Sequence, residues 1–383
     1  MNTTTPTKRI GYLDAARGIA ACMVMFYHYL GWKYPQNMAV KWSHFIFNGS
    51  DAVSFFFVLS GFVLAFPYLH HSRSLDVGKF YVNRAYRIYP AFWVALALNA
   101  WFSMRKDFHN APLETFFNTF IANKNGFWEE ALLIRGRSRY LGLDWTLTIE
   151  IVMSFMIPYL IAMTFYNKRL LLWFSVSTFL MGAIIGVFVM PFALGMIACL
   201  YFDEIQAPSF KQTKWYRYRV PILFLAFLFF SIRHIDRIFP FGGKAMDILS
   251  LLQLDFFTFT AIGSFIFLVF IIHSKSTQRF LEHPVLLFLG KISYGIYLLH
   301  WVIVAAIFEY WDPIVARFPS TKIAFITMLA VCVGLTITLA TALYYWVELP
   351  FINWGKRITS QWKPSLVISK EQKTEAASTE KNP

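Results

Sequence analysis

The chain has 383 residues, of which 57% are hydrophobic, 19% aromatic and only 15% charged. Soluble globular proteins carry roughly 45–50% apolar and about 25% charged residues, so this composition excludes a soluble globular protein. The net charge of +14 comes from Lys and Arg spread over short segments between apolar runs. That distribution is typical of membrane topology and argues against nucleic acid as a partner.

Apolar runs long enough to cross about 30 Å of hydrocarbon recur along the chain. They predict about ten transmembrane helices, near residues 13–33, 50–70, 88–104, 143–165, 170–188, 191–203, 219–233, 249–272, 288–309 and 323–347. The sixth and seventh runs are short for a complete span, so nine or eleven spans are alternatives. The predicted fold class is all-α, a polytopic helical bundle that lies in the lipid bilayer.

The distribution of Lys and Arg predicts the orientation of the bundle. With the N-terminus in the cytoplasm, 20 of these residues fall on the cytoplasmic side and 13 on the other side, which places both termini in the cytoplasm. We expect a short cytoplasmic segment over 1–9, a membrane domain over 10–357 and a polar, disordered tail over 358–383. The long external loop 105–142 either folds over the bundle or lies on the bilayer surface.

Ionisable side chains inside expected spans are functional candidates, because charge in hydrocarbon costs about 2.5–3.5 kcal/mol per residue. Arg17 and His28 are eleven residues apart, close to three helical turns, and therefore share one face of the first helix. Glu150, Asp255 and His300 are expected near the depth of His28, where the four groups would form a polar cavity. A second, mostly cationic group is expected near the cytoplasmic face, with the members Arg17, Arg84, Arg87, Lys291 and Glu348.

Each of these residues also has a purely structural interpretation. His300 could serve only as a hydrogen-bond partner between helices, Arg84 and Arg87 could be ordinary cytoplasmic anchors, and Glu348 could pair with one of them. The cysteines Cys22, Cys199 and Cys332 lie in apolar runs without paired spacing. We therefore expect neither a disulfide framework nor a metal site.

Six motifs occur in an order that resembles the membrane acyltransferase-3 family of O-acyltransferases. They cover residues 10 to 357 and are Tyr12-Leu13-Asp14-Ala15-Ala16-Arg17-Gly18 with Phe26-Tyr27-His28; Phe56-Phe57-Val58-Leu59-Ser60-Gly61-Phe62; Arg84-Ala85-Tyr86-Arg87-Ile88-Tyr89-Pro90; Trp145-Thr146-Leu147-Thr148-Ile149-Glu150; Leu289-Gly290-Lys291-Ile292-Ser293-Tyr294 running to His300-Trp301; and Val347-Glu348-Leu349-Pro350-Phe351. Ile151 follows Glu150 where the family frequently has a second Glu. The chain resembles members that stand alone, without an appended esterase-like domain.

The resemblance implies transfer of an acyl group, usually acetyl from acetyl-CoA, to a hydroxyl of a carbohydrate or lipid-linked glycan. His28 is then expected to be the general base, with Glu150 orienting it and Arg17 close by. Arg84 and Arg87, expected at the N-terminus of the third helix, would hold the CoA phosphates together with Arg17. A covalent acyl-His intermediate is an alternative to direct transfer.

Two other classes of protein are alternatives. A proton-coupled transporter could use His28, Glu150, Asp255 and His300 as a relay, which would also explain the buried charges. A non-catalytic membrane scaffold would have no need for Arg17 and His28 together. Neither accounts for two arginines three residues apart or for the ordered motifs. We expect an integral protein of the bacterial cytoplasmic membrane, whose acceptor the sequence does not identify.

Overall fold

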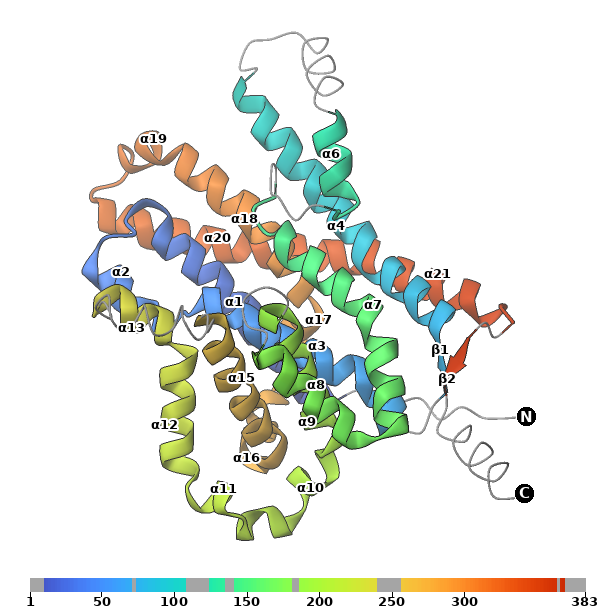
Figure 1. Ribbon diagram of the computed structural model, residues 1–383. Coiled ribbons are helices and arrows are strands. Elements are labelled where there is room, and N and C mark those ends of the chain that lie inside the picture. The colour runs from blue at the N-terminus through green and yellow to red at the C-terminus, as the bar shows by residue number, and fades with distance from the viewer. Residues whose placement is uncertain are drawn as a thin grey trace, which may run out of the picture.

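The computed structural model describes residues 10–70, 74–107, 124–134, 141–180, 186–239, 256–363 and 366–368. Nearly all of these residues are helical (Figure 1). The strands in this part of the chain are β1 (Leu75–Asp76) and β2 (Val367–Ile368), which pair antiparallel. The predicted all-α class is therefore confirmed.

The helices of the first half of the chain are α1 (Gly11–Lys33), α2 (Met38–Ser43), α3 (Gly49–Leu69), α4 (Val77–Asp107), α6 (Lys124–Ala131), α7 (Asp144–Tyr166), α8 (Lys168–Leu180) and α9 (Gly186–Leu200). Short turns follow in α10 (Phe202–Gln206), η2 (Pro208–Gln212) and α11 (Lys214–Arg217). The second half contains α12 (Arg219–Phe230), α13 (Ile232–Ile238), α15 (Phe256–His273), α16 (Lys275–Leu281), α17 (Pro284–Lys291), α18 (Ser293–Glu309), α19 (Trp311–Val315), α20 (Thr321–Leu343), η3 (Tyr344–Glu348) and α21 (Leu349–Ser360).

Four helical segments of the described chain are long and apolar enough to cross a membrane. They are α3, α7, α15 and the continuous stretch from Thr321 to Ser360, and α17 with α18 makes a fifth if this pair, bent by 70°, is one span. The helices α1 and α4 are also long, but they carry several charged residues. The protein is thus an integral membrane protein, and the count of ten spans stays a prediction.

The third expected span begins much earlier in the structure than expected. It was expected over 88–104, yet α4 begins at Val77 and ends at Asp107. The polar residues before Ile88 continue the helix because helix formation needs backbone hydrogen bonds and not an apolar sequence. Arg84 and Arg87 therefore lie inside α4 and not in its first turn, so the free N–H groups expected beside them belong to residues one to three turns earlier.

Three further expected spans have different boundaries in the structure. The span expected over 191–203 begins at Gly186, and the span over 288–309 is broken at Ile292. The span expected over 249–272 is α15, which ends at His273, while residues 249–255 lie outside the described part.

The expected disordered tail is partly ordered. The helix α21 continues to Ser360, and β2 pairs with β1 in the register Leu75 to Ile368 and Asp76 to Val367. Val367 and Ile368 are apolar, and the pairing gives their backbone groups hydrogen-bond partners. The prediction of disorder from 358 onward was therefore wrong for these residues, and residues 369–383 lie outside the described part.

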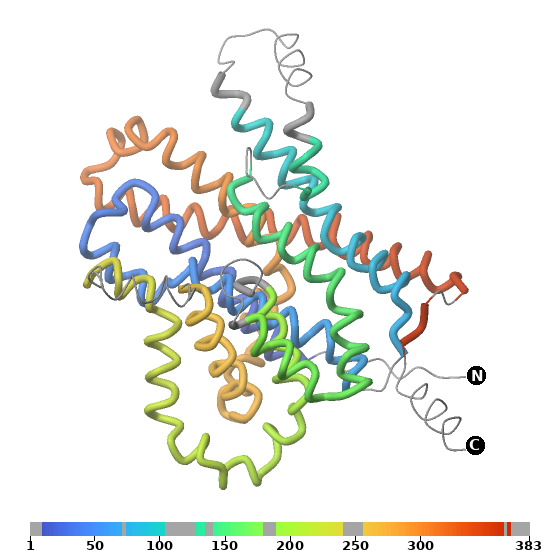
Figure 2. Tube along the Cα trace, in the orientation of Figure 1, coloured from blue at the N-terminus to red at the C-terminus, as the bar shows by residue number. Residues whose placement is uncertain are grey.

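The helix α1 packs at the centre of the bundle against α3, α17 and α18. The pairs α3–α9, α12–α15 and α4–α21 lie side by side around it, as the trace in Figure 2 shows for α12 and α15. At one end of the bundle α2 and α13 lie side by side near the C-terminal end of α1, and α19 lies at the same end but apart from them (Figure 1). The last turns of α1 therefore lie close to these short helices.

Glycines allow the closest helix contacts. A Cβ on Gly195 of α9 would collide with the backbone oxygen of Val58 in α3, and one on Gly61 would collide with the backbone oxygen of Phe192. The helices α1 and α17 meet in the same way, since a Cβ on Gly18 would lie 2.6 Å from the backbone nitrogen of Gly290. Small residues of this kind let membrane helices approach each other closely.

We expect Gly195→Ala to destabilise the protein by about 1–3 kcal/mol or more, because backbone atoms of α3 would have to move to make room for the methyl group. Thermal unfolding of the purified protein in detergent measures the effect. The matched control is Gly334→Ala in α20, where an added Cβ meets no atom within 4 Å. Equal melting temperatures for the two variants would contradict the proposed backbone contact.

Candidate functional site

Two histidines from distant parts of the chain meet in the centre of the bundle. Nδ1 of His28 in α1 lies 3.0 Å from Nε2 of His300 in α18, and their rings are stacked with centroids 5.2 Å apart. The sequence prediction that the two lie at similar depth is confirmed. His300 is fully buried, whereas His28 is partly accessible.

The hydrogen bonds of this pair determine which nitrogen atoms carry protons when both rings are neutral. Nδ1 of His300 lies 3.0 Å from the backbone oxygen of Ile296, which can only accept, so Nδ1 carries the proton. Nε2 of His300 is then an acceptor, and Nδ1–H of His28 donates to it. The remaining lone pair of His28 is on Nε2, so the arrangement leaves this nitrogen free to take up a proton.

His28 lies in the wall of a cavity of about 610 Å³, at the end of the bundle where α2 and α13 lie. The rings of Tyr27, Trp32 and Trp301 form part of this wall, and Trp301 packs edge-on against His28 with ring centroids 5.1 Å apart. The remaining lining residues are Gly31, Pro35, Gln36, Lys41, His44, His234 and Arg237. The cavity therefore combines a candidate base with aromatic and cationic walls.

The expected partner of His28 lies elsewhere. Glu150 in α7 accepts a hydrogen bond and ion pair of 2.7 Å from Arg84 in α4, and Ser154 accepts a second bond of 3.1 Å from the same guanidinium. The position expected to orient His28 is occupied by His300 instead. The sequence predicted Glu150 near the depth of His28 and Arg84 near the cytoplasmic face. Because α4 begins earlier than expected, Arg84 lies deeper in the bundle, at the same depth as Glu150.

A row of polar side chains on α18 connects the two clusters. Tyr294 donates to the backbone oxygen of Ile88, Tyr297 lies 2.6 Å from the hydroxyl of Thr146, and His300 meets His28. Residues three apart on a helix are neighbours on one face. The row therefore runs from the Arg84–Glu150 level up to the cavity.

The other expected cytoplasmic residues occupy separate positions. Arg17 pairs with Asp14 one turn earlier in α1, at 3.1 Å. Glu348 is buried at the end of η3, a π-helical segment packed against α4, and is attracted by the positive charge of Arg87. Lys291 is exposed at the end of α17. Asp255 lies outside the described residues.

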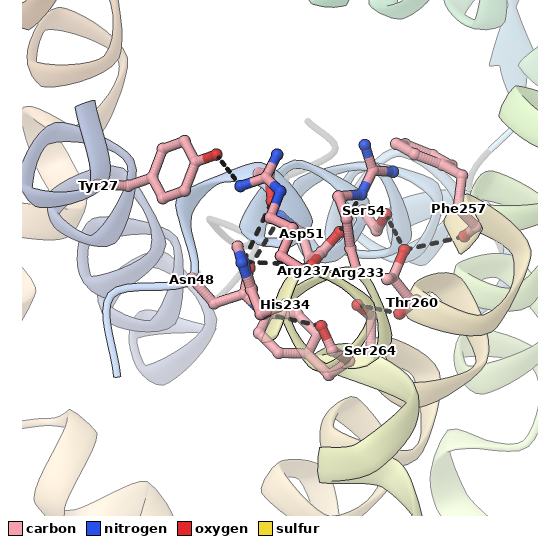
Figure 3. A network of polar contacts seen from close by, with 12 residues as sticks. Tyr27, Asn48, Asp51, Ser54, Arg233, His234, Arg237, Phe257, Thr260 and Ser264 are labelled. Carbon is pink, nitrogen blue, oxygen red and sulfur yellow. Dashed lines mark hydrogen bonds and ion pairs between the residues drawn. The ribbon is translucent and has the colours of Figure 1, made fainter. Parts of the chain in front are cut away.

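A polar network that the sequence prediction missed supports the cavity wall (Figure 3). Asp51 in the first turn of α3 is fully buried, with an ion pair of 3.3 Å to Nε of Arg233 and a contact of 3.7 Å to Nε2 of His234. Asn48, whose amide donates to the backbone oxygen of Phe230, lies 2.7 Å from the same His234 nitrogen. Asp51 falls within the expected span 50–70, so the criterion of buried charge could have identified it.

Two histidines of this region lie in segments that connect the spanning helices, and both stay neutral near pH 7. Burial lowers the pKa of His44 to about 4 and that of His234 to about 3, and the positive charge of Arg237 acts in the same direction. The rings of His44 and Tyr27 pack with centroids 4.3 Å apart. The positive charge of the cavity at neutral pH therefore comes from Lys41 and Arg237.

Comparisons with known proteins give one broad match and one partial match. The family described as "Acyltransferase domain" matches residues 10–345. A segment of 163 residues is 28% identical to Nodulation protein 10 of Rhizobium leguminosarum bv. viciae and spans 39% of this chain and 43% of that protein. No solved structure matches the chain.

Proposed function

The chain belongs to the acyltransferase-3 family, and from this premise we propose that it transfers an acyl group, acetyl above all, from acyl-CoA to a hydroxyl of a cell-envelope or exported carbohydrate. The observation that carries the proposal is the His28–His300 pair, which leaves Nε2 of His28 unprotonated at the wall of a cavity. Membership of an enzyme family sets aside the transporter and scaffold alternatives.

The proposed chemistry needs one base. Nε2 of His28 takes the proton of the acceptor hydroxyl while the oxygen attacks the thioester carbonyl, so that an O–C bond forms and the C–S bond breaks. The CoA thiolate leaves and receives the proton from His28. His300 holds the ring of His28 in the required tautomer and orientation, which is the role that carboxylates play in other acyl-transfer sites.

Acyl-CoA is proposed to enter from the cytoplasmic end of the bundle, with Arg87, Arg84 and Arg17 near its phosphates. One guanidinium group can donate two parallel hydrogen bonds to two oxygens of a phosphate, which favours arginine at a phosphate-binding site. Each of the three also faces a carboxylate of the chain, Arg84 that of Glu150, Arg17 that of Asp14 and Arg87 that of Glu348. The acyl group would reach His28 along the polar row of α18.

The proposed topology has ten spans, with both termini in the cytoplasm and the His28 cavity on the opposite side. It is supported by the charge asymmetry of the sequence and by the position of the cavity at the end of α1 remote from its N-terminus. Reporters fused after Ser360 test it. A reporter that is active only outside the cytoplasm would contradict the topology.

The proposed function is tested with purified protein in nanodiscs, acetyl-CoA labelled in its acetyl group, and envelope glycans from a strain that lacks the protein. We expect label to enter the glycans as an alkali-labile ester, and CoA to be released in equal amount. Failure of the protein to bind acetyl-CoA or to form any labelled ester would refute the proposal.

The donor site gives a separate prediction. We expect Arg87→Lys to weaken CoA binding by about tenfold or more, because a single ammonium group replaces a bidentate fork, and to reduce the difference in affinity between CoA and dephospho-CoA. Calorimetric titration of both ligands measures this. Lys291→Arg, a change at an exposed position, is the control, and unchanged affinity in Arg87→Lys would make Arg87 an ordinary anchor.

A further inference from the structure

We infer that the acceptor is an anionic glycan, whose acylated hydroxyl lies close to a carboxylate or phosphate group that the His28 cavity binds. This inference rests on the proposed function and adds the chemical class of the acceptor. It comes from the walls of the cavity, whose cationic residues Lys41 and Arg237 belong to none of the six sequence motifs.

The first observation is the charge of the cavity. Among the described residues that line it, Lys41 and Arg237 are cationic and none carries a carboxylate. Lys41 makes no ion pair with any described residue, and Arg237 donates a hydrogen bond of 2.9 Å to the hydroxyl of Tyr27, which is neutral. Two positive charges thus face the same space without a balancing charge in its wall.

A carboxylate behind this wall is already engaged in an ion pair. Asp51 is fully buried and pairs with Arg233. Its electrostatic attraction for Arg237 is weaker than its attraction for Arg233. Figure 3 shows Arg237 reaching from α13 toward Tyr27, while Arg233 and His234 lie against Asp51. The network holds α13 in place as part of the cavity wall. The positive charge of Arg237 therefore stays available to a ligand in the cavity.

The second observation is an unused hydrogen-bonding atom. Nε2 of His44 is buried and has no hydrogen-bond partner among the described residues. Gly31 of α1 lets this ring approach, because a Cβ there would lie 3.3 Å from Cε1 and Nε2 of His44. A buried polar atom without a partner costs free energy, and a hydroxyl of the acceptor would supply the missing bond.

The third observation is the shape and composition of the remaining wall. Tyr27, Trp32 and Trp301 offer aromatic rings against which the apolar face of a sugar ring can pack. A volume of about 610 Å³ lies within the usual range of ligand sites, roughly 300–1,000 Å³. His28 stands between Trp301 and Tyr27, with ring centroids at 5.1 and 5.3 Å. A sugar held by its charge and ring would therefore present a hydroxyl to the base.

The test measures binding in nanodiscs without any acyl donor, by calorimetric titration. The probes are methyl β-glucuronide, glucose 6-phosphate and methyl β-glucoside, which supply a carboxylate, a phosphate and no charge. We expect at least one anionic probe to bind tenfold or more tightly than the glucoside at low salt, with the advantage shrinking as salt screens the charges. The better of the two anions identifies which charged group the acceptor carries.

Four variants test which residues cause the effect. Arg237→Gln and Lys41→Gln should each lower the affinity of the anionic probe, relative to that of the glucoside, by about tenfold. The affinities for the glucoside and for CoA should stay unchanged. Tyr27→Phe, which removes only the hydrogen bond to Arg237, should retain the advantage. Arg317→Gln removes an exposed cation at the same end of the bundle, outside the cavity lining, and should change nothing.

Equal affinity for all three probes, no measurable binding of any, or an unchanged preference in both Arg237→Gln and Lys41→Gln would overturn the inference. None of these results affects the proposed function, which is measured by ester formation from acetyl-CoA. Conversely, selective binding of an anionic probe by a protein that forms no ester would retain the anionic site and refute the transferase proposal.

Discussion

Replacing His28 by Ala is expected to lower acyl transfer by about 10²–10⁴-fold, because the acceptor hydroxyl would lose the base that removes its proton. The rate of ester formation from labelled acetyl-CoA measures the loss, and CoA affinity should stay close to that of the wild type. His70→Ala is the control, since His70 pairs with Asp203 and is absent from the lining of the cavity. Near wild-type turnover in His28→Ala would refute the proposed base and make His300 the next candidate.

The role of His300 can be separated from simple packing. His300→Ala should reduce the rate less than His28→Ala and change the pH dependence of kcat/KM, because the ring of His28 would lose the acceptor that fixes its tautomer. His300→Gln should restore part of the rate, since its amide oxygen can accept the proton of Nδ1. Equal losses in both variants with an unchanged pH profile would reduce His300 to a packing residue.

Breaking the Arg84–Glu150 ion pair is expected to have the largest effect on stability. The side chains are only 11% and 25% exposed, so Glu150→Ala or Arg84→Ala leaves one charge buried without its partner, at a cost of about 3–5 kcal/mol. Thermal unfolding in detergent measures both variants. The double variant Arg84→Met with Glu150→Leu should regain most of the stability, because no lone charge remains.

The control for this effect is the exposed pair of Lys33 and Asp312, whose side chains are 35% and 90% exposed. Lys33→Ala should change stability by no more than about 1 kcal/mol, as exposed ion pairs contribute little. A Glu150→Ala protein as stable as the wild type would contradict the proposed structural role. Stability regained by the double variant without CoA binding would indicate that Arg84 also serves the donor.

Local patterns in the sequence were sufficient to predict the structural features that depend on a single helix. Apolar length predicted the helices that became α3, α7, α15 and α20, because each can satisfy its backbone hydrogen bonds on its own. The spacing of Arg17 and His28 predicted one shared face of α1. The positions of helix ends were less certain, and the polar first three turns of α4 were missed because they resemble a loop in composition.

Local sequence patterns did not predict the contacts between helices, because these contacts depend on how the helices pack in the tertiary structure. His28 and His300 are 272 residues apart, and their hydrogen bond requires the rotation and the depth of both helices to agree. Glu150 was expected beside His28 on the basis of depth alone, yet Thr146 one turn earlier meets Tyr297, and Glu150 meets Arg84. An error of eleven residues in the start of α4 was enough to assign the two charges to opposite sides of the membrane.

The sequence by itself determined that the chain is a helical membrane protein and that His28 and the arginines are the residues to examine, because these features follow from composition and helical periodicity. Only the tertiary structure decided which side chain orients His28 and what lines the space beside it. The cavity wall comes from α1, α2, α13 and α18 and from the segments on both sides of α2, and no spacing along the chain encodes how these segments meet. Packing between helices therefore determined the chemistry of the site.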